Sequence, residues 1–478
     1  MENPKQILNK AEKNKAKVAV GLSGGVDSSV SASLLVEQGY EVHGVFLECW
    51  RGPGCRVDED RKDALDVALE LGIPFQVLDF KKEYYDKVVE YFYAEYKAGR
   101  TPNPDTMCNR EIKFGMFYDW AMEKNNFDYI ATGHYARVAT RQTFLTGSQS
   151  ENLDGQAGHY ARVLDGQASS SEQQVTGNKK KNSASLDPSA SLRCVQDDRD
   201  QQISHFLQRG VDPNKDQSYF LYQLRSEQLE HILFPIGHLT KTQVRAEAEK
   251  RNLKTASKPD SQGICFIGPV NVTEFLEEKI EREKGDVVIK DTRDNKQVTC
   301  LRRQANKTQS SIINNQSFLR IGTHTGYAFH TIGQKVGKEI DQELVSKLCK
   351  SGVLDFDPTN MPALFVIEKD IERNLLVVGT EEKLLRREFE VISVNWLVSE
   401  LAGKTSENLI NQSINQLINT FVRIRNLGDL FKAELEFEGE KIKVRLEQPI
   451  RAVAPGQACV FYSDGSAEAF VLGGGIIV

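Results

Sequence analysis

The sequence of 478 residues lacks any uninterrupted run of about 18 apolar residues, the length at which a helix can cross a membrane. We therefore expect no membrane contact through a spanning segment. The first residues, MENPKQILNKAEKNKAK, are polar and lysine-rich and lack the apolar segment of a secretory signal. These absences predict a cytoplasmic protein.

The eight cysteines form no Cys-x-x-Cys pair and no His-spaced set typical of zinc, so no metal site is predicted from them. In a reducing compartment a structural disulfide framework is not expected. Any cysteine that matters should therefore act as a nucleophile or as a sulfur carrier.

A large excess of charge of either sign is also missing. The formal net charge is −6, charged residues make up 27% and hydrophobic residues 40%, which is the composition of a globular protein. Because no bulk attraction to nucleic acid follows, any RNA contact would need local basic patches. Basic residues at alternating positions near the C-terminal end, such as Lys441, Lys443 and Arg445, either form such a patch or belong to ordinary solvated strands.

Apolar runs alternate with helical patterns from about residue 17 to residue 137. The runs are KVAVGLS, EVHGVFLE, PFQVLDF and FDYIATGHY, and amphipathic segments separate them. This alternation predicts an α/β fold with an open parallel sheet and helices on both faces. Ligands of such sheets bind at the carboxyl ends of the strands, where residues 21–29 and 132–135 lie.

Composition divides the rest of the chain. We expect a nucleotide-binding domain over residues 1–235, interrupted at about 139–212 by a polar insertion without regular structure. A small helical connector follows over 236–288. Short strands with Gly and Pro turns over 289–478 predict a β-barrel, with further polar insertions at 302–316 and 403–416.

The segment SGGVDSS, residues 23–29, lies where a strand turns into a helix. Its glycines let backbone N–H groups approach phosphate oxygens, its hydroxyls add donors, and the helix N-terminus favours an anion. It lacks the Lys-Ser/Thr ending of a Walker A loop and the pattern G-x-G-x-x-G. A pyrophosphate group is thus the expected ligand, and a tight turn with an Asp cap is the alternative.

Two cysteines stand out by their surroundings. Cys108 lies in AGRTPNPDTMCNREIKFG and Cys265 lies in SKPDSQGICFIG, both of which are polar segments defined by Pro or Gly. Such loops are poor core positions and good reactive ones, and nearby cations favour the thiolate. The two thiols can meet only through the fold.

SGGVDSS resembles the PP-loop of the ATP pyrophosphatases, which cleave ATP between the α and β phosphates. Taken with other segments in the same order, the chain closely resembles the tRNA-specific 2-thiouridylases over nearly its whole length apart from the polar insertions. The segments are GLSGGVDSSV, AEYKAGRTPNPDTMCNREIKFG, DYIATGHYAR, NKDQSYFLY, DSQGICFIG, YAFHTIGQKVG, PGQACVFY and VLGGGII. The resemblance implies an adenine nucleotide alpha hydrolase-like (PP-loop) domain, a small central connector and a C-terminal β-barrel that binds tRNA.

The resemblance implies ATP-dependent 2-thiolation of the wobble uridine, position 34, of tRNA. ATP with Mg²⁺ would adenylate the uridine C2 oxygen, and sulfur would then displace AMP. The implied nucleotide-binding residues are Gly21, Leu22, Ser23, Gly24, Gly25, Val26, Asp27, Ser28, Leu47 and Gly133.

The same resemblance assigns roles around the substrate. Cys265 would carry sulfur as a persulfide, Cys108 would be the nucleophile that releases it or closes a transient disulfide with Cys265, and Asp105 would be the acid/base. The sulfur donor would be a cysteine desulfurase or a sulfur-relay protein. The implied base- and tRNA-binding residues are Asn103, Pro104, Asp105, His134, Lys215, Asp216, Gln217, Arg425, Asn426 and Gln457. Asn426 departs from the family, which often has an aromatic residue there.

Two other functions remain open on the residues alone. A PP-loop amide-forming synthetase would explain the loop and would leave the two loop cysteines without a role. A non-catalytic RNA-binding module would use the barrel and would leave the intact SGGVDSS segment without a role.

Overall fold

The computed structural model describes residues 15–52, 55–144, 201–260, 263–291, 310–313, 316–350, 353–354, 356–357, 360–398, 401 and 417–478. The chain forms two units, one of residues 1–138 with 206–478 and the other of residues 139–205. Most of the expected insertion at 139–212 lies outside the described residues. Its two ends differ from the expectation, because β5 (Ala136–Phe144) and β6 (Gln201–Arg209) pair as a two-stranded sheet.

A five-stranded parallel sheet forms the centre of the N-terminal domain, which confirms the predicted α/β fold. Its order is β3 (Phe75–Asp79), β2 (Glu41–Glu48), β1 (Lys17–Gly21), β4 (Tyr129–Ala131) and β7 (Ile232–Leu233). The apolar runs of β1 and β2 are buried because helices cover both faces. The strand order reverses between β1 and β4, and ligands of doubly wound sheets bind at such a point.

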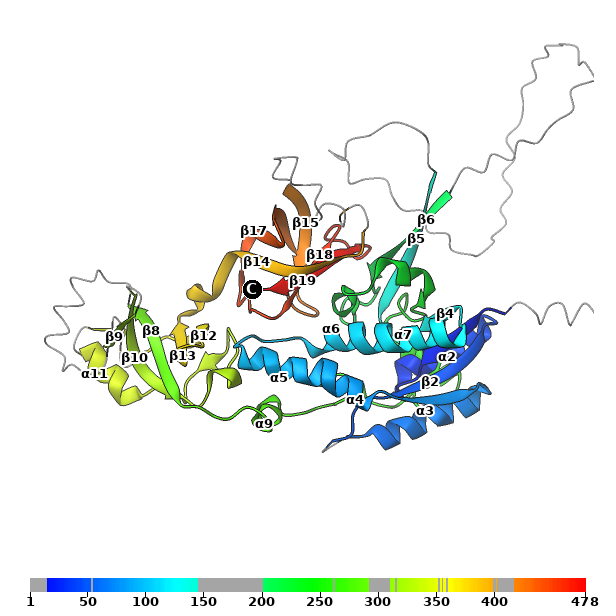
Figure 1. The fold of residues 1–478 in the computed structure, drawn as a ribbon, viewed down its shortest axis with the longest axis horizontal. Helices are drawn as coiled ribbons and strands as arrows, with labels where there is room; N and C mark the ends of the chain where they lie inside the picture. Colours follow the sequence, from blue (N-terminus) through cyan, green and yellow to red (C-terminus); the bar gives the residue numbers. More distant parts are fainter. Residues whose placement is uncertain are drawn as a thin grey trace, which may run out of the picture. The chain divides into compact units, whose positions relative to one another are not determined.

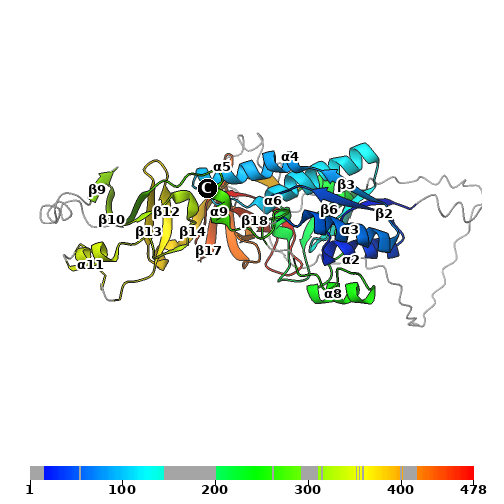
Figure 2. The ribbon, with the colours of Figure 1, turned by 90° about the horizontal axis from the view of Figure 1, so that it is seen from below.

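Helices cover the two faces of this sheet (Figures 1 and 2). On one face lie α2 (Val26–Glu37) and α3 (Val57–Leu71), and α8 (Lys241–Lys250) packs against α2. On the other face runs a first helical segment of α4 (Lys81–Tyr84), η2 (Tyr85–Val89) and α5 (Glu90–Lys97). A second helical segment on this face comprises α6 (Pro104–Cys108), η3 (Asn109–Met116), α7 (Phe117–Asp119) and η4 (Trp120–Lys124).

The second segment begins at a strong local signal. The side chain of Asn103 accepts hydrogen bonds from the N–H groups of Asp105 and Thr106, and Pro104 occupies the first helical position. The following η3 and η4 are π-helical, a conformation that is frequent at functional sites. This cap fixes where Cys108 enters the core.

A β-sheet and a closed β-barrel follow, where the pattern of strands in the sequence predicts a single β-barrel. A six-stranded sheet has the order β11 (Lys335–Val336), β12 (Leu364–Asp370), β13 (Leu375–Gly379), β8 (Gly285–Asp291), β10 (Gln316–His324) and β9 (Ser310–Ile313). A closed barrel then comprises β14 (Leu385–Trp396), β17 (Lys441–Arg451), β16 (Phe431–Glu438), β15 (Leu417–Arg423), β18 (Ala458–Tyr462) and β19 (Val471–Ile477). The barrel confirms the predicted fold class.

Short helices complete the description. They are η5 (Ser218–Leu221), η6 (Ser226–His231), α9 (Val272–Glu277), η7 (Tyr327–Phe329), α11 (Gln342–Lys350) and η8 (Glu381–Leu384). Among the described helices, none is long and apolar enough to cross a membrane.

A buried ion pair connects the barrel to the segment before η5. The Asp216 carboxylate, 0% exposed, lies 2.9 Å from both the Arg209 and the Arg423 guanidinium groups. It also accepts hydrogen bonds from the N–H groups of Gly210 and Ser218. Burial alone would raise the pKa of Asp216. The hydrogen bond from Arg209 and the charge of Arg423 outweigh this effect and lower the pKa.

We expect Arg423→Met to destabilise the protein by about 3 kcal/mol, because a buried carboxylate loses one of its two cations. The measurement is the urea midpoint of unfolding. Lys441→Met is the control, since its partner Glu390 forms an exposed pair in the same barrel. Equal midpoints for the two variants would show that the buried pair contributes no stability.

Candidate active site

The turn after β1 forms a cradle of backbone donors at the N-terminus of α2. Gly24 has φ +73°, and a Cβ atom there would lie 2.3 Å from the Asp60 carbonyl oxygen. The Ser23 N–H donates to the Ser28 hydroxyl at 3.1 Å, and that hydroxyl donates to the Gly25 carbonyl. The turn is thus fixed with the helix N-terminus behind it, as an anion site requires.

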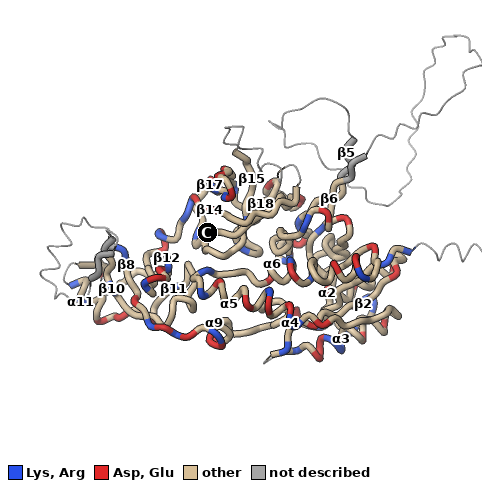
Figure 3. Tube along the Cα trace, viewed as in Figure 1, with Lys and Arg blue, Asp and Glu red and all other residues tan. Residues whose placement is uncertain are grey.

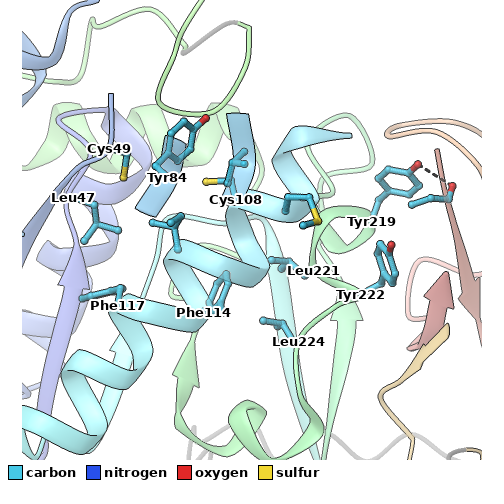
Figure 4. Close-up of a cluster of buried hydrophobic side chains, with 14 of the residues drawn as sticks. Leu47, Cys49, Tyr84, Cys108, Phe114, Phe117, Tyr219, Leu221, Tyr222 and Leu224 are labelled. Atoms are coloured by element: carbon cyan, nitrogen blue, oxygen red, sulfur yellow. Dashed lines mark hydrogen bonds between the residues drawn. The ribbon is translucent and has the colours of Figure 1, made fainter. Parts of the chain in front are cut away.

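The turn after β4 packs directly on this cradle. A Cβ atom at Gly133 would lie 2.7 Å from the Ser28 backbone nitrogen, so only glycine fits there. Leu47, at the end of β2, lies in the buried cluster that also contains Cys49 and Cys108 (Figure 4). The structure thus brings most of the predicted nucleotide-binding residues to the carboxyl ends of β1, β2 and β4.

Three charged residues beside the cradle, Lys241, Arg245 and Asp260, are not among the site residues predicted from the sequence. Asp27 accepts a hydrogen bond from the Tyr135 hydroxyl at 2.7 Å and from Lys241 Nζ at 2.8 Å. Asp260 binds three cations, Lys215, Lys241 and Arg245, at 2.6–2.8 Å. No motif marks α8, and only the fold brings Lys241 to Asp27.

The two cysteines singled out in the sequence meet. The expectation of two loop positions is wrong for Cys108, which ends helix α6 and is fully buried because the helical segment packs on the sheet. Cys108 Sγ and Cys265 Sγ are 3.5 Å apart, a contact between thiols without a bond. Asp105 Oδ1 accepts the Cys265 N–H at 3.0 Å, and the Tyr84 hydroxyl donates to the Cys265 carbonyl at 2.6 Å. One carboxylate and one phenol therefore hold the loop that places Cys265.

The two thiols differ in acidity. The hydrogen bond from Cys108 and the charge of Lys113, acting against burial, lower the pKa of Cys265 to about 7. Burial raises the pKa of the Cys108 thiol well above its ordinary value, and burial likewise raises the pKa of Asp105. Cys265 is therefore the thiolate of the pair at neutral pH, and Cys108 is the proton donor.

The residues expected to contact tRNA lie in three places. His134 is buried and lies beside Lys113. Lys215, Asp216 and Gln217 are consecutive, and each has its own partner. Lys215 pairs with Asp260, and Asp216 pairs with the two arginines. Gln217 accepts a hydrogen bond from the Tyr135 N–H at 2.9 Å. Because the Asp216 carboxylate is fully buried, we expect it to position its neighbours.

The barrel supplies the remaining residues. Gln457 Nε2 donates to the Thr101 carbonyl at 2.8 Å, at the start of the segment that leads to Cys108. Arg425 donates to the Ala452 carbonyl at 2.7 Å, and Asn426 is exposed beside it. In the described structure neither contacts the cysteine pair through a hydrogen bond or ion pair.

Among the described barrel residues, four of the basic side chains near the C-terminal end are each paired with a carboxylate. Carboxylates pair with Lys441, Lys443, Arg445 and Arg451 at 2.8–3.3 Å. Figure 3 shows Lys and Arg interspersed with Asp and Glu along the tube. These residues therefore belong to mixed strand faces.

Comparison with known proteins finds three family models along the chain. A tRNA methyl transferase HUP domain matches residues 16–155 and 148–269, a tRNA methyl transferase PRC-barrel domain matches residues 298–380, and an aminomethyltransferase beta-barrel domain matches residues 386–477. The match to the PRC-barrel domain covers most of the six-stranded sheet, and the match to the aminomethyltransferase beta-barrel domain covers the closed barrel.

Curated relatives match over the whole chain. A protein named tRNA-specific 2-thiouridylase MnmA from Streptococcus mutans is 37% identical over 98% of this chain and 96% of its own. One of the same name from Photobacterium profundum is 36% identical over 98% of each chain. Among solved structures, the U34-tRNA thiolase NcsA from Methanococcus maripaludis, solved with its 4Fe-4S cluster, is 29% identical, with a TM-score of 0.20 over 26% of this chain and 39% of its own.

We expect Gly24→Ala to weaken ATP binding at least about tenfold, because the added Cβ meets the Asp60 backbone and alanine disfavours this positive φ. Titration calorimetry measures the effect. Gly72→Ala is the matched control, since Gly72 also has a positive φ, +65°, but ends α3, where an added Cβ atom would meet nothing within 4 Å. If both variants bound ATP as the wild type does, the cradle would not be the nucleotide site.

Proposed function

The chain belongs to the tRNA-specific 2-thiouridylase family, and from that premise we propose that it catalyses the ATP-dependent 2-thiolation of the wobble uridine of tRNA. The observation that carries this proposal is the 3.5 Å contact between Cys108 Sγ and Cys265 Sγ, in a site that shares the β4 turn with the phosphate cradle. Thiol chemistry and nucleotide chemistry thus have one location.

The first step activates an inert carbonyl. The uridine C2 oxygen attacks the α phosphorus of ATP, pyrophosphate leaves, and an adenylate forms on O2. Residues 21–28 would hold the phosphates, with Leu47 and Gly133 against the nucleoside. Burial raises the pKa of Asp105. Its carboxylate would accept the N3 proton that uridine must lose.

The second step transfers sulfur. The outer sulfur of a Cys265 persulfide attacks C2, and AMP leaves with the C2 oxygen. Cys108, as its thiolate, then attacks Cys265 Sγ, so that the S–S bond of the persulfide breaks and 2-thiouridine is released. The Cys108–Cys265 disulfide that results is transient, and a thiol reductant restores both thiols. Release of sulfide by Cys108 before attack on C2 leaves the same disulfide.

Mg²⁺ would neutralise the phosphate charge during adenylation. Among the described residues, no three His, Cys, Asp or Glu side chains are grouped to hold a metal ion. Phosphate oxygens and water would therefore supply most of its ligands, as is usual for nucleotide-bound Mg²⁺.

The partners follow from the chemistry. A base in an anticodon loop is single-stranded and can be turned outward, and Asn103, Pro104 and Asp105 would line its pocket beside Cys108. Sulfur would come from a cysteine desulfurase or a relay protein that carries a persulfide. Localisation in the cytoplasm stays a prediction.

The two alternative functions fit the structure less well. An amide-forming synthetase gives no reason for two thiols held in contact by Asp105 and Tyr84. An RNA-binding module gives no reason for a glycine with positive φ at position 24, packed against the Asp60 backbone.

The test is mass spectrometry of nucleosides from unmodified tRNA incubated with the protein, ATP, Mg²⁺ and a persulfide donor. We expect 2-thiouridine from the wild type and a loss of at least about a hundredfold in Cys265→Ala and Cys108→Ala, because each removes a sulfur atom that the transfer needs. Pyrophosphate release should persist in both variants.

Cys349→Ala is the matched control, since Cys349 is half-buried like Cys265 but lies in α11. Its thiolation rate should equal that of the wild type. Formation of AMP and pyrophosphate without any thiolated base would retain the adenylation step and refute the substrate assignment.

A further inference from the structure

Lys113 lies close to the two cysteines and has no role in the steps above. It belongs to η3, one turn after Cys108, and is largely withdrawn from solvent. Its ammonium group lies 3.5 Å from His134 Nε2 and 5.7 Å from the centre of the ring of Phe266, the residue after Cys265. Its positive charge acts on the Cys265 thiol. It faces the site and not the surface.

His134 is neutral in this environment. Burial, together with the charge of Lys113, lowers the pKa of His134 well below its ordinary value. Nε2 of the neutral ring then accepts from Lys113, and we assign the ring proton to Nδ1, which donates to the Thr132 hydroxyl at 2.7 Å. Thr132, His134 and Lys113 thus form a chain of hydrogen bonds that ends at the Lys113 ammonium group.

The other titratable groups around Cys265 do not supply a positive charge. They are Asp105 and Cys108 of α6, Cys49 after β2, and Tyr84 of α4, and burial raises the pKa of each. Burial alone would lower the pKa of Lys113, but the neighbouring Cys265 raises it above the ordinary value. Among these groups Lys113 is the one cation.

We propose that Lys113 is a catalytic residue that holds the negative charge on the sulfur of Cys265, and that His134 and Thr132 are positioning residues that keep its ammonium group there. This inference rests on the proposed function, in which Cys265 carries the sulfur.

The ammonium group acts at two moments of the sulfur transfer. The Cys265 thiolate attacks the outer sulfur of the donor persulfide, and the S–S bond of the donor breaks. The leaving donor thiolate takes the proton of the new Cys265 persulfide, so that the new outer sulfur carries the negative charge. That anion, still beside Lys113, is the nucleophile that attacks C2. The position of Lys113 therefore decides which of the two thiols takes up sulfur, and Cys108 stays protonated until the last step.

The test measures the alkylation rate of Cys265 by iodoacetamide against pH, with mass spectrometry of the peptide that contains it. The reduced full-length protein is used without tRNA or ATP. The wild type should show a midpoint near the pKa of about 7. Lys113→Met should raise the midpoint by at least about one pH unit, so that alkylation at pH 7 falls roughly tenfold.

Lys113→Arg should keep the midpoint within about half a unit, because it restores a cation. Thr132→Val should raise the midpoint by less than Lys113→Met does. Lys87→Met is the matched control, because Lys87 pairs with Glu111 at the surface, and its midpoint should not move. Thermal melts of each variant separate these effects from unfolding.

An unchanged Cys265 midpoint in folded Lys113→Met would overturn the inference, even if that variant lost thiolation. A midpoint that rose equally in Lys113→Arg and Lys113→Met would overturn it too, because shape and not charge would then matter. Failure of the wild type to thiolate tRNA would refute the proposed function, and it would be seen separately from the alkylation data.

Discussion

The packing of the β4 turn against the first turn of α2 is the constraint on which the site depends. Gly133 allows this approach, since any side chain would strike the Ser28 backbone. The next residue, His134, then faces Lys113, and Tyr135 reaches Asp27 with its hydroxyl. Three consecutive residues thereby fix the phosphate cradle and the thiols relative to each other. A sulfur transfer that follows adenylation needs such a fixed distance, because both reactions occur at one uridine carbon.

Local patterns in the sequence predict the parts of this arrangement that depend on neighbours in the chain. Strand and helix periodicity gave the parallel sheet, and the SGGVDSS segment gave the cradle. Contacts between distant residues are different, because nothing in the periodicity of one segment specifies its partner. Asp27 and Lys241 are 214 residues apart, and the two cysteines are 157 apart. The sequence places the cation Lys113 close after Cys108 and the resemblance marks His134, but only the fold shows that Lys113 acts on Cys265 and lies 3.5 Å from His134.

The division of the C-terminal half shows the same limit. Strands of the six-stranded sheet and of the barrel have the same alternation, so the sequence predicted one β-region. What separates them is pairing: β13 runs parallel to β8 across a long connection, whereas β14 pairs with β17 and β19. The paired charges on the barrel likewise follow from register, since Arg445 lies directly opposite Glu388 on the facing strand and Lys443, two residues away, also reaches Glu388.

The segment 215–217 joins the three parts of the site. Lys215 pairs with Asp260, close before the Cys265 loop, while Asp216 pairs with Arg423 of the barrel and Gln217 holds the Tyr135 backbone. Of these three contacts, that of Lys215 is the least costly to break. Asp260 keeps Lys241 and Arg245 when Lys215 leaves, and the Lys215 side chain is 37% exposed against 13% for Lys241. Lys215 can therefore leave Asp260, as the proposed contact with tRNA would require, without leaving a buried charge unpaired, whereas withdrawing Asp216 would leave two arginines without their shared partner.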